Sequence, residues 1–183
     1  MNDLLVRLCN IGDIRKFLAL SPGGLQSIPW GKGQEIHIWY YTGKSILRAE
    51  LEKYSYWLDE SENKRFQTRV RPLDRAEFIS SHLFLRKVLS LYTGTSPGNI
   101  VFSHHPSGKP FILLPSEQHF FFSMSRSAGA IAVGVSRSLE MGIDLERIDE
   151  DMPWKEMASS HFPPGEAEMF ESHHDPLGTF YRY

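Results

Sequence analysis

Cysteine is almost absent from this chain of 183 residues, and long apolar runs are absent altogether. Cys9 is the single cysteine, so no intrachain disulfide can form, which fits a reducing compartment. No run of about 18 apolar residues occurs, so we expect no membrane span. The opening residues MNDLLVRLCN place Asp3 early and lack a long apolar core, which makes a poor signal peptide. We therefore expect a cytoplasmic protein.

An excess of one charge is also lacking. Lys and Arg number 20 against 22 Asp and Glu, which gives a formal net charge of −2. A dedicated nucleic-acid binder usually shows a clear basic excess, so we expect no nucleic-acid partner, although a local basic site for a phosphorylated ligand is compatible with this charge. The length fits one domain or two small halves that share a core.

The first part of the chain predicts a helix, a loop and a strand. Apolar residues recur at roughly helical spacing from Leu4 to Ile14, and SPGGLQSIPWGKGQ then breaks any periodicity. The segment EIHIWYY, residues Glu35–Tyr41, alternates and is rich in β-formers, so it predicts a strand. Apolar residues then step by four, three and four between Ser45 and Leu58, which predicts an amphipathic helix.

The strongest helical pattern follows. Asp74 with Glu77 three residues later forms a capping-box pattern, and Pro72 just precedes this cap. An apolar stripe continues from Phe78 onward, and Gly94 is a natural stop.

After Gly94 the pattern predicts a meander of short strands. Five β-like runs are separated by turn residues: IVF, GKPFILL, HFFFSMS, AIAVGVS and MGIDLE. Residues 153–162 and 164–173 return to a helical rhythm. Helices, then strands, then helices predict an α+β fold.

Two carboxylates lie close together in MGIDLERI. In a strand, Asp144 and Glu146 share one face and lie about 7 Å apart at Cα, because each residue rises ~3.3 Å. That spacing lets their oxygens converge on a hard cation such as Mg²⁺. The alternative interpretation is an ordinary solvated strand face, on which charged residues alternate with apolar ones.

Two further motifs suit a phosphorylated ligand. In PSGKPFI, Gly108 turns the chain and presents Lys109, which can meet a phosphate as a point charge. In FSMSRS, the hydroxyl of Ser125 and the guanidinium of Arg126 lie at a strand end and suit phosphate binding. A solvated hairpin lysine and a polar turn are the alternative interpretations.

Other polar clusters favour a plainer interpretation. The pairs His104–His105 and His173–His174 are adjacent, which is not the spacing of a helical zinc site, so we expect surface loops. A basic cluster could receive a nucleotide phosphate or could be a solvated helix start; its members are Lys64, Arg65, Arg69, Arg71 and Arg75.

Taken in order, these motifs resemble a known family. The series EIHIWYY, RPLDRAEFISSHLFLRKVLSLYTG, GKPFI, FSMSRS, GIDLERI and HFPPGEAEMF to FYRY is similar to the two-halved, surfactin-synthetase-type 4′-phosphopantetheinyl transferases. The resemblance covers roughly residue 35 to the end. It implies an α+β fold of two pseudo-symmetric sheet-plus-helix halves, 35–116 and 117–183, preceded by a helix-and-loop extension over 1–34.

The resemblance implies an activity and its partners. The family transfers 4′-phosphopantetheine from coenzyme A to a serine of an acyl or peptidyl carrier protein, uses Mg²⁺ and releases 3′,5′-ADP. A divalent cation and fixed Lys and Arg donors would stabilise the charge that builds on the pyrophosphate. The attacking serine belongs to the partner, so this chain needs no catalytic serine of its own.

The resemblance also assigns residues. Asp144 and Glu146 would hold Mg²⁺, and Glu166 would be the acid of the following helix. Lys109 would contact a coenzyme A phosphate, and Ser125 would lie beside the adenosine diphosphate part. Arg126 stands where the family has histidine, and Arg75 is a candidate phosphate partner. Glu77 lies where some members place a phosphate-binding arginine.

The family pattern continues beyond Tyr183. It goes on with a tryptophan and then a lysine–glutamate–alanine helix, whose glutamate is a further metal ligand and whose lysine assists catalysis. We therefore expect an incomplete second half, weak activity at most, and self-association through its uncovered strands. The alternative is a non-catalytic module that binds coenzyme A or a carrier protein, and an unrelated α+β phosphate binder is the third interpretation.

Overall fold

The computed structural model describes residues 4–20, 30–31, 33–42, 48–113 and 120–182. The chain divides into two compact units, Met1–Leu145 and Glu146–Tyr183. The strands are β1 (Leu5–Asn10), β2 (Glu35–Tyr41), β3 (Val101–His104), β4 (Pro110–Leu113), β5 (Phe121–Ser127) and β6 (Ala130–Ser136). The helices of the first unit are α1 (Ile14–Ala19), α2 (Arg48–Glu52), η2 (Ser55–Trp57), α3 (Glu60–Gln67), α4 (Pro72–Thr93) and η3 (Pro97–Asn99).

A four-stranded mixed sheet organises the first unit, with strand order β1-β2-β6-β5. β1 runs parallel to β2, and the other two pairs are antiparallel. The buried side of β2 carries its alternate residues Glu35, His37, Trp39 and Tyr41, so the predicted strand is confirmed. β3 and β4 form a separate two-stranded sheet. The α+β fold class is therefore confirmed.

The amino-terminal helix expected over Leu4–Ile14 is wrong. Residues 5–10 form β1, and helix α1 starts only at Ile14, after Asp13 caps it by accepting from the amides of Arg15 and Lys16. The leucines satisfy helical spacing, but pairing with β2 gives the backbone of this segment its hydrogen bonds instead. Residues 5–10 therefore belong to the main sheet.

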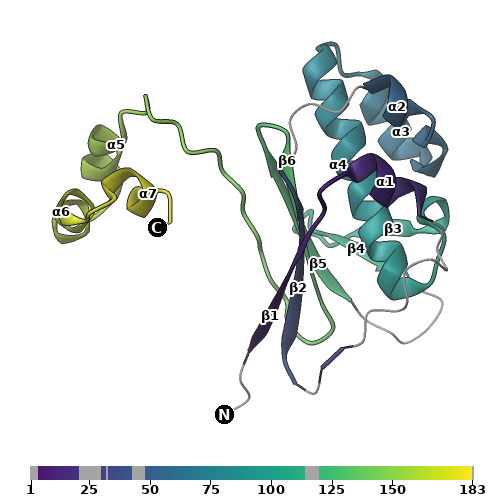
Figure 1. Cartoon of the computed structure of the whole chain (residues 1–183), viewed down its shortest axis with the longest axis horizontal. Helices are drawn as coiled ribbons and strands as arrows, with labels where there is room; N and C mark the ends of the chain where they lie inside the picture. The colour runs from purple at the N-terminus through teal and green to yellow at the C-terminus, as the bar shows by residue number, and fades with distance from the viewer. Residues whose placement is uncertain (1–3, 21–29, 32, 43–47, 114–119, 183) are drawn as a thin grey trace. The chain divides into compact units, whose positions relative to one another are not determined.

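Helix α4 packs against one face of that sheet (Figure 1) and supplies the centre of the core. Phe17 of α1 lies between the two layers, with its ring 5.8 Å from Trp39 of β2 and 5.4 Å from Phe84 of α4. The predicted stop at Gly94 is confirmed, since Gly94 has φ 67°, a left-handed conformation that glycine adopts without strain.

The start of α4 differs from the capping-box prediction. Pro72 occupies the first turn and Arg71 is the N-cap residue, so Asp74 lies inside the first turn rather than before it. The helix expected over Ser45–Leu58 is broken into α2 and η2, and its first three residues lie outside the described part of the chain.

A polar network is buried between the sheet and α4. Trp39 donates from Nε1 to the Tyr92 hydroxyl at 2.8 Å, and that hydroxyl lies 2.7 Å from His37 Nδ1. On its other side, His37 Nε2 lies 3.0 Å from a carboxylate oxygen of Glu35, which also accepts from Arg7. Arg7 compensates the buried charge of the Glu35 carboxylate, whereas His37 Nε2, although close to that carboxylate, makes no hydrogen bond of normal geometry.

The second unit contains α5 (Trp154–His161), α6 (Pro164–Ser172) and α7 (Pro176–Phe180). The first two confirm the predicted helical rhythm, whereas α7 was not predicted. The rings of Phe162, Phe170 and Phe180 meet edge to face at centroid distances of 5.1–6.1 Å. No helix in the described part of the chain is long and apolar enough to cross a membrane.

Candidate functional site

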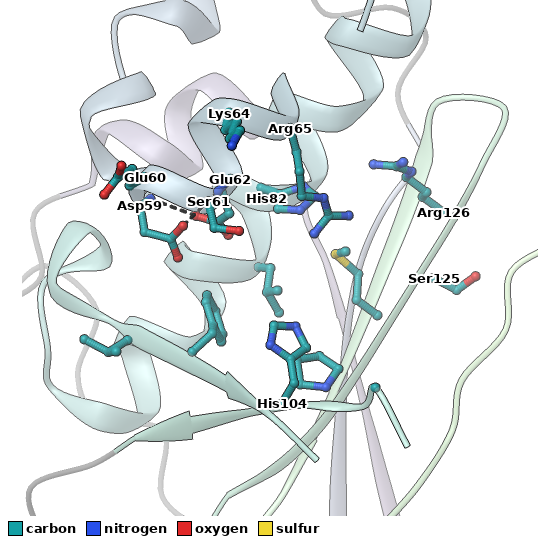
Figure 2. Close-up of a pocket in the computed structure, with 16 residues that line it drawn as sticks. Asp59, Glu60, Ser61, Glu62, Lys64, Arg65, His82, His104, Ser125 and Arg126 are labelled. Carbon is teal, nitrogen blue, oxygen red and sulfur yellow. Dashed lines mark hydrogen bonds between the residues drawn. The ribbon is translucent and has the colours of Figure 1, made fainter. Parts of the chain in front are cut away.

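A pocket of about 990 Å³ lies within the first unit. Its walls come from α3, α4, β3 and β5, together with the turn before β4. Figure 2 shows that its charges are separated: carboxylates of Asp59 and Glu60 lie at one end, and Arg65 and Arg126 lie at the other. This volume is in the range of small-molecule and cofactor sites, ~300–1,000 Å³.

At the acidic end of the pocket, the carboxylates of Asp59 and Glu62 already have partners within the protein. Asp59 caps α3 in a capping box with Glu62, and both carboxylates accept from the buried guanidinium of Arg86, at 2.9 and 2.6 Å. Arg86 also donates to the carbonyls of Pro97 and Ile100. Burial raises the pKa of the Glu62 carboxyl, and Arg86 opposes that rise. This ion-pair network fixes α3 against α4 and compensates part of the negative charge at that end of the pocket.

At the basic end of the pocket, the contacts of Arg126 and Arg65 are to uncharged groups. Arg126 donates to the Ser81 hydroxyl at 2.7 Å and to the Glu77 carbonyl at 3.4 Å, and the guanidinium of Arg65 lies over the ring of Phe78. These partners are neutral. Burial, followed by repulsion from Arg69 and Arg65, lowers the pKa of the Arg126 guanidinium, and the nearby carboxylates of Glu77 and Asp74 oppose part of that shift. An anion bound here would compensate this concentrated positive charge.

His82 of α4 lines the same pocket and stacks on Phe78, with ring centroids 3.8 Å apart. Its Nδ1 lies 2.8 Å from the Phe78 carbonyl, which can only accept, so Nδ1 carries the proton. Burial lowers the pKa of His82 to about 4, and the positive charges of Arg126, Arg65 and Arg86 add to this effect. At neutral pH the imidazole is therefore uncharged.

Ser125 and Asp144 are brought together at β5. The Ser125 hydroxyl donates to Asp144 Oδ1 at 2.9 Å and accepts from the Leu145 amide at 3.1 Å. Arg126, the next residue, projects from the opposite face of β5 toward α4 (Figure 2), as alternation along a strand requires. Glu146 and Glu166 belong to the second unit, where both are exposed and Glu166 lies in the first turn of α6.

The segment MGIDLE was predicted as a strand, and that prediction is wrong. Residues 141–146 have no strand ladder. The amides of Ile143 and Leu145 donate to side chains of β5 rather than to its backbone.

Lys109 lies after the turn that Gly108 makes at φ 85°. Its ammonium donates to Glu140 at 2.9 Å and to the Met141 carbonyl at 3.1 Å. Lys109 lines a smaller pocket of about 300 Å³ with Phe120, Phe121 and Phe122. The pair with Glu140 is largely exposed, so a phosphate could replace the carboxylate at low cost.

Arg75 is not among the residues that line the large pocket. Its guanidinium lies over the ring of Phe66, 4.6 Å from the centroid, and its Nε has no hydrogen-bond partner. The structure therefore joins Arg65, Arg126 and Ser125 around one pocket and gives Arg75 a place beside an aromatic ring.

Comparison with known proteins finds two similar curated proteins. HetI, a 4′-phosphopantetheinyl transferase of a Nostoc species, is 27% identical over 152 residues, which is 81% of this chain and 64% of HetI. The Synechocystis protein slr0495, assigned provisionally to the same transferases, is 27% identical over 125 residues, which is 68% of this chain and 51% of slr0495. The chain is similar to 4′-phosphopantetheinyl transferases over most of its length. It spans about half to two thirds of the length of these relatives, and no model of a known protein family matches it.

A magnesium ion that is held in part by a bound phosphate needs few protein ligands. Within the described residues, no group of three or more His, Cys, Asp or Glu side chains could hold a metal. Mg²⁺ in phosphate chemistry is commonly held by one or two carboxylates plus substrate phosphates, and keeps several waters. Asp144 and Glu146 are both exposed carboxylates, two positions apart in the chain, and their chemistry fits that requirement.

Sequence reasoning missed two residues of the large pocket. His104 of β3 lines it, although its adjacent-pair spacing favoured a surface loop. His82 gave one usable signal, the run Ser80-Ser81-His82 of polar residues inside an otherwise apolar stretch of helix, where a buried polar side chain needs a partner or a ligand.

Proposed function

We propose that this chain carries out, or derives from a protein that carries out, Mg²⁺-dependent transfer of 4′-phosphopantetheine from coenzyme A to a carrier-protein serine. The observation that carries the proposal is the basic end of the large pocket, with Arg65 and Arg126 on neutral partners, beside the Ser125–Asp144 pair on β5. The two transferase relatives support the same assignment.

Coenzyme A would bring negative charge to the basic end of this pocket. It brings a phosphorylated ribose and a pyrophosphate, whose negative charges would compensate Lys64, Arg65 and Arg126. Lys109 would contribute one more positive charge when it exchanges Glu140 for a phosphate. A set of fixed cations of this kind holds the leaving group in place and lowers the energy of charge that develops on it.

The transfer step places few demands on this chain. The serine oxygen of the carrier protein attacks the phosphorus that bears the pantetheine arm, the phosphoanhydride bond breaks, and 3′,5′-ADP leaves while the serine proton passes to a base. Asp144 and Glu146 would hold Mg²⁺, which supplies charge neutralisation at the pyrophosphate. Glu166 is the carboxylate that we propose as a further participant from α6.

The test is to incubate the purified chain with coenzyme A, Mg²⁺ and several apo carrier proteins, and to weigh the carriers by intact mass spectrometry. We expect a mass gain of one phosphopantetheine that Asp144→Ala abolishes. Asp151→Ala is the matched control, because it removes another exposed carboxylate from the same acidic stretch and should leave transfer intact.

Coenzyme A binding separates the alternative function from failure of the proposal. Tight binding that Mg²⁺ strengthens, without mass gain on any carrier, would identify a non-catalytic coenzyme A-binding module. No binding of coenzyme A in calorimetry, with or without Mg²⁺, would contradict both functions.

A further inference from the structure

The segment that carries Asp144 is attached to the sheet in an unusual way. Residues 141–145, here called the strap, cross the face of β5 and β6 that points away from α4. The amide of Ile143 donates to the Ser123 hydroxyl at 3.1 Å, and the amide of Leu145 donates to the Ser125 hydroxyl at 3.1 Å. Two serine side chains thus replace the backbone carbonyls of a normal ladder.

The strap lies against Gly134 of β6, which has no side chain. A Cβ placed on Gly134 of β6 would lie 3.0 Å from Met141 Sδ and 3.2 Å from Ile143 Cγ2. These contacts mean that the strap packs closely on β6 at Gly134, where a Cβ would displace its side chains by a few tenths of an ångström. The carbonyl of Met141, the first residue of the strap, also accepts from the Lys109 ammonium.

Ser125 differs from Ser123 in one respect. A serine hydroxyl has one hydrogen to donate, and that of Ser125 is directed to Asp144 Oδ1 at 2.9 Å, while its oxygen accepts from Leu145. A phosphate oxygen needs a donor, and the single donor of Ser125 is already engaged. The hydroxyl is therefore arranged to hold the carboxylate rather than a phosphate.

We propose that Ser125 is a positioning residue, which fixes the strap and orients the Asp144 carboxylate toward Mg²⁺, rather than a direct contact to coenzyme A. The idea rests on the proposed function for the role of Asp144. Side chains that hold a metal ligand in this way typically affect metal affinity about 10–100-fold.

The first measurement needs no metal and no activity. Amide hydrogen exchange, followed by NMR on the metal-free chain, should show that Ser125→Ala speeds exchange of the Leu145 amide about tenfold. Ser123→Ala is the matched control: it should speed exchange at Ile143 by a similar factor and leave the contact to Asp144 intact. Ser125→Thr keeps the hydroxyl and should restore protection at Leu145.

The second measurement separates positioning from phosphate contact. Calorimetric titration of coenzyme A at a series of Mg²⁺ concentrations should show that Ser125→Ala raises the half-saturating Mg²⁺ concentration about tenfold, and Ser123→Ala less than about twofold. In EDTA, Ser125→Ala should leave the affinity for coenzyme A unchanged.

Each other outcome decides against the positioning role or against the proposed function. Weaker binding of Ser125→Ala in EDTA, with an unchanged Mg²⁺ requirement, would make Ser125 a phosphate contact and overturn the proposal. Unchanged exchange at Leu145 would overturn it as well. If the wild-type chain binds no coenzyme A, the proposed function fails, and exchange at Leu145 alone decides whether Ser125 holds the strap.

Discussion

The buried imidazole of His82 should make folding stability depend on pH. The pKa of His82 is lowered from 6.5 to about 4 in the folded chain, chiefly by burial. Between these two pH values the unfolded chain binds a proton that the folded chain does not. The stabilisation is therefore fully present above about pH 6.5 and is lost as the pH falls toward 4. The whole difference corresponds to about 3 kcal/mol, of which about 2 kcal/mol is lost between pH 7 and pH 5.

The assay is urea unfolding followed by tryptophan fluorescence at pH 7 and pH 5. His82→Gln keeps a donor for the Phe78 carbonyl but does not titrate, so the loss in the wild-type chain should exceed that in the variant by about 2 kcal/mol. His104→Gln is the control, because His104 is exposed and should not change the loss. Equal losses in the wild-type chain and in His82→Gln would refute the reasoning.

The same unfolding measurement can be repeated in the presence of coenzyme A. A phosphate beside Arg65 and Arg126 would offset the positive charges that oppose protonation of His82. Saturating coenzyme A should therefore reduce the difference between the wild-type chain and His82→Gln. An unchanged difference would indicate that the phosphates bind away from His82.

Three other substitutions test separate contacts. Gly134→Ala should lower the free energy of unfolding by about 1–2 kcal/mol in urea titration, because its methyl group meets Met141; no loss would contradict the packing of the strap. Arg86→Met should cost about 3–5 kcal/mol by leaving Glu62 buried without its partner, and adding Glu62→Leu should recover much of that loss in the same assay; a double variant as unstable as the single one would contradict this reading. Arg126→Ala should weaken coenzyme A binding about 10–100-fold in calorimetry, and Arg126→Lys less; an unchanged Kd would remove Arg126 from the site.

The sequence predicted those elements that are determined by the residues within them. β2 and the end of α4 follow from alternation and from a glycine in the left-handed region. The strand β1 could not be predicted, because leucines at 4, 5 and 8 fit a helix, and only its pairing with β2, about 30 residues away, decides otherwise. The predicted start of α4 was wrong because two signals compete there: Pro72 favours a helix that begins at Pro72, whereas the capping-box pattern of Asp74 favours one that begins after Asp74.

The candidate site shows the same limit. The sequence places Asp144 after a strand-like stretch but cannot show that the Ser125 hydroxyl meets it across 19 positions. Arg126 and Ser81 are 45 positions apart, so their contact depends on how β5 packs on α4. Residue types indicated which side chains could bind phosphate, and tertiary packing decided which of them share a pocket.

The strand order has a consequence for synthesis of the chain. β2 pairs with β6, whose residues follow about 90–100 positions later, so the inner edge of β2 stays unpaired until β6 leaves the ribosome. At roughly 5–20 residues per second, that interval lasts ~5–20 s, ample time for an exposed strand edge to meet another chain. Helix α4 is complete long before β6 emerges and can shield the apolar face of β2, but it leaves the edge open. The yield of folded protein should therefore depend on chaperones or translation speed during this interval more than on the stability of the finished fold.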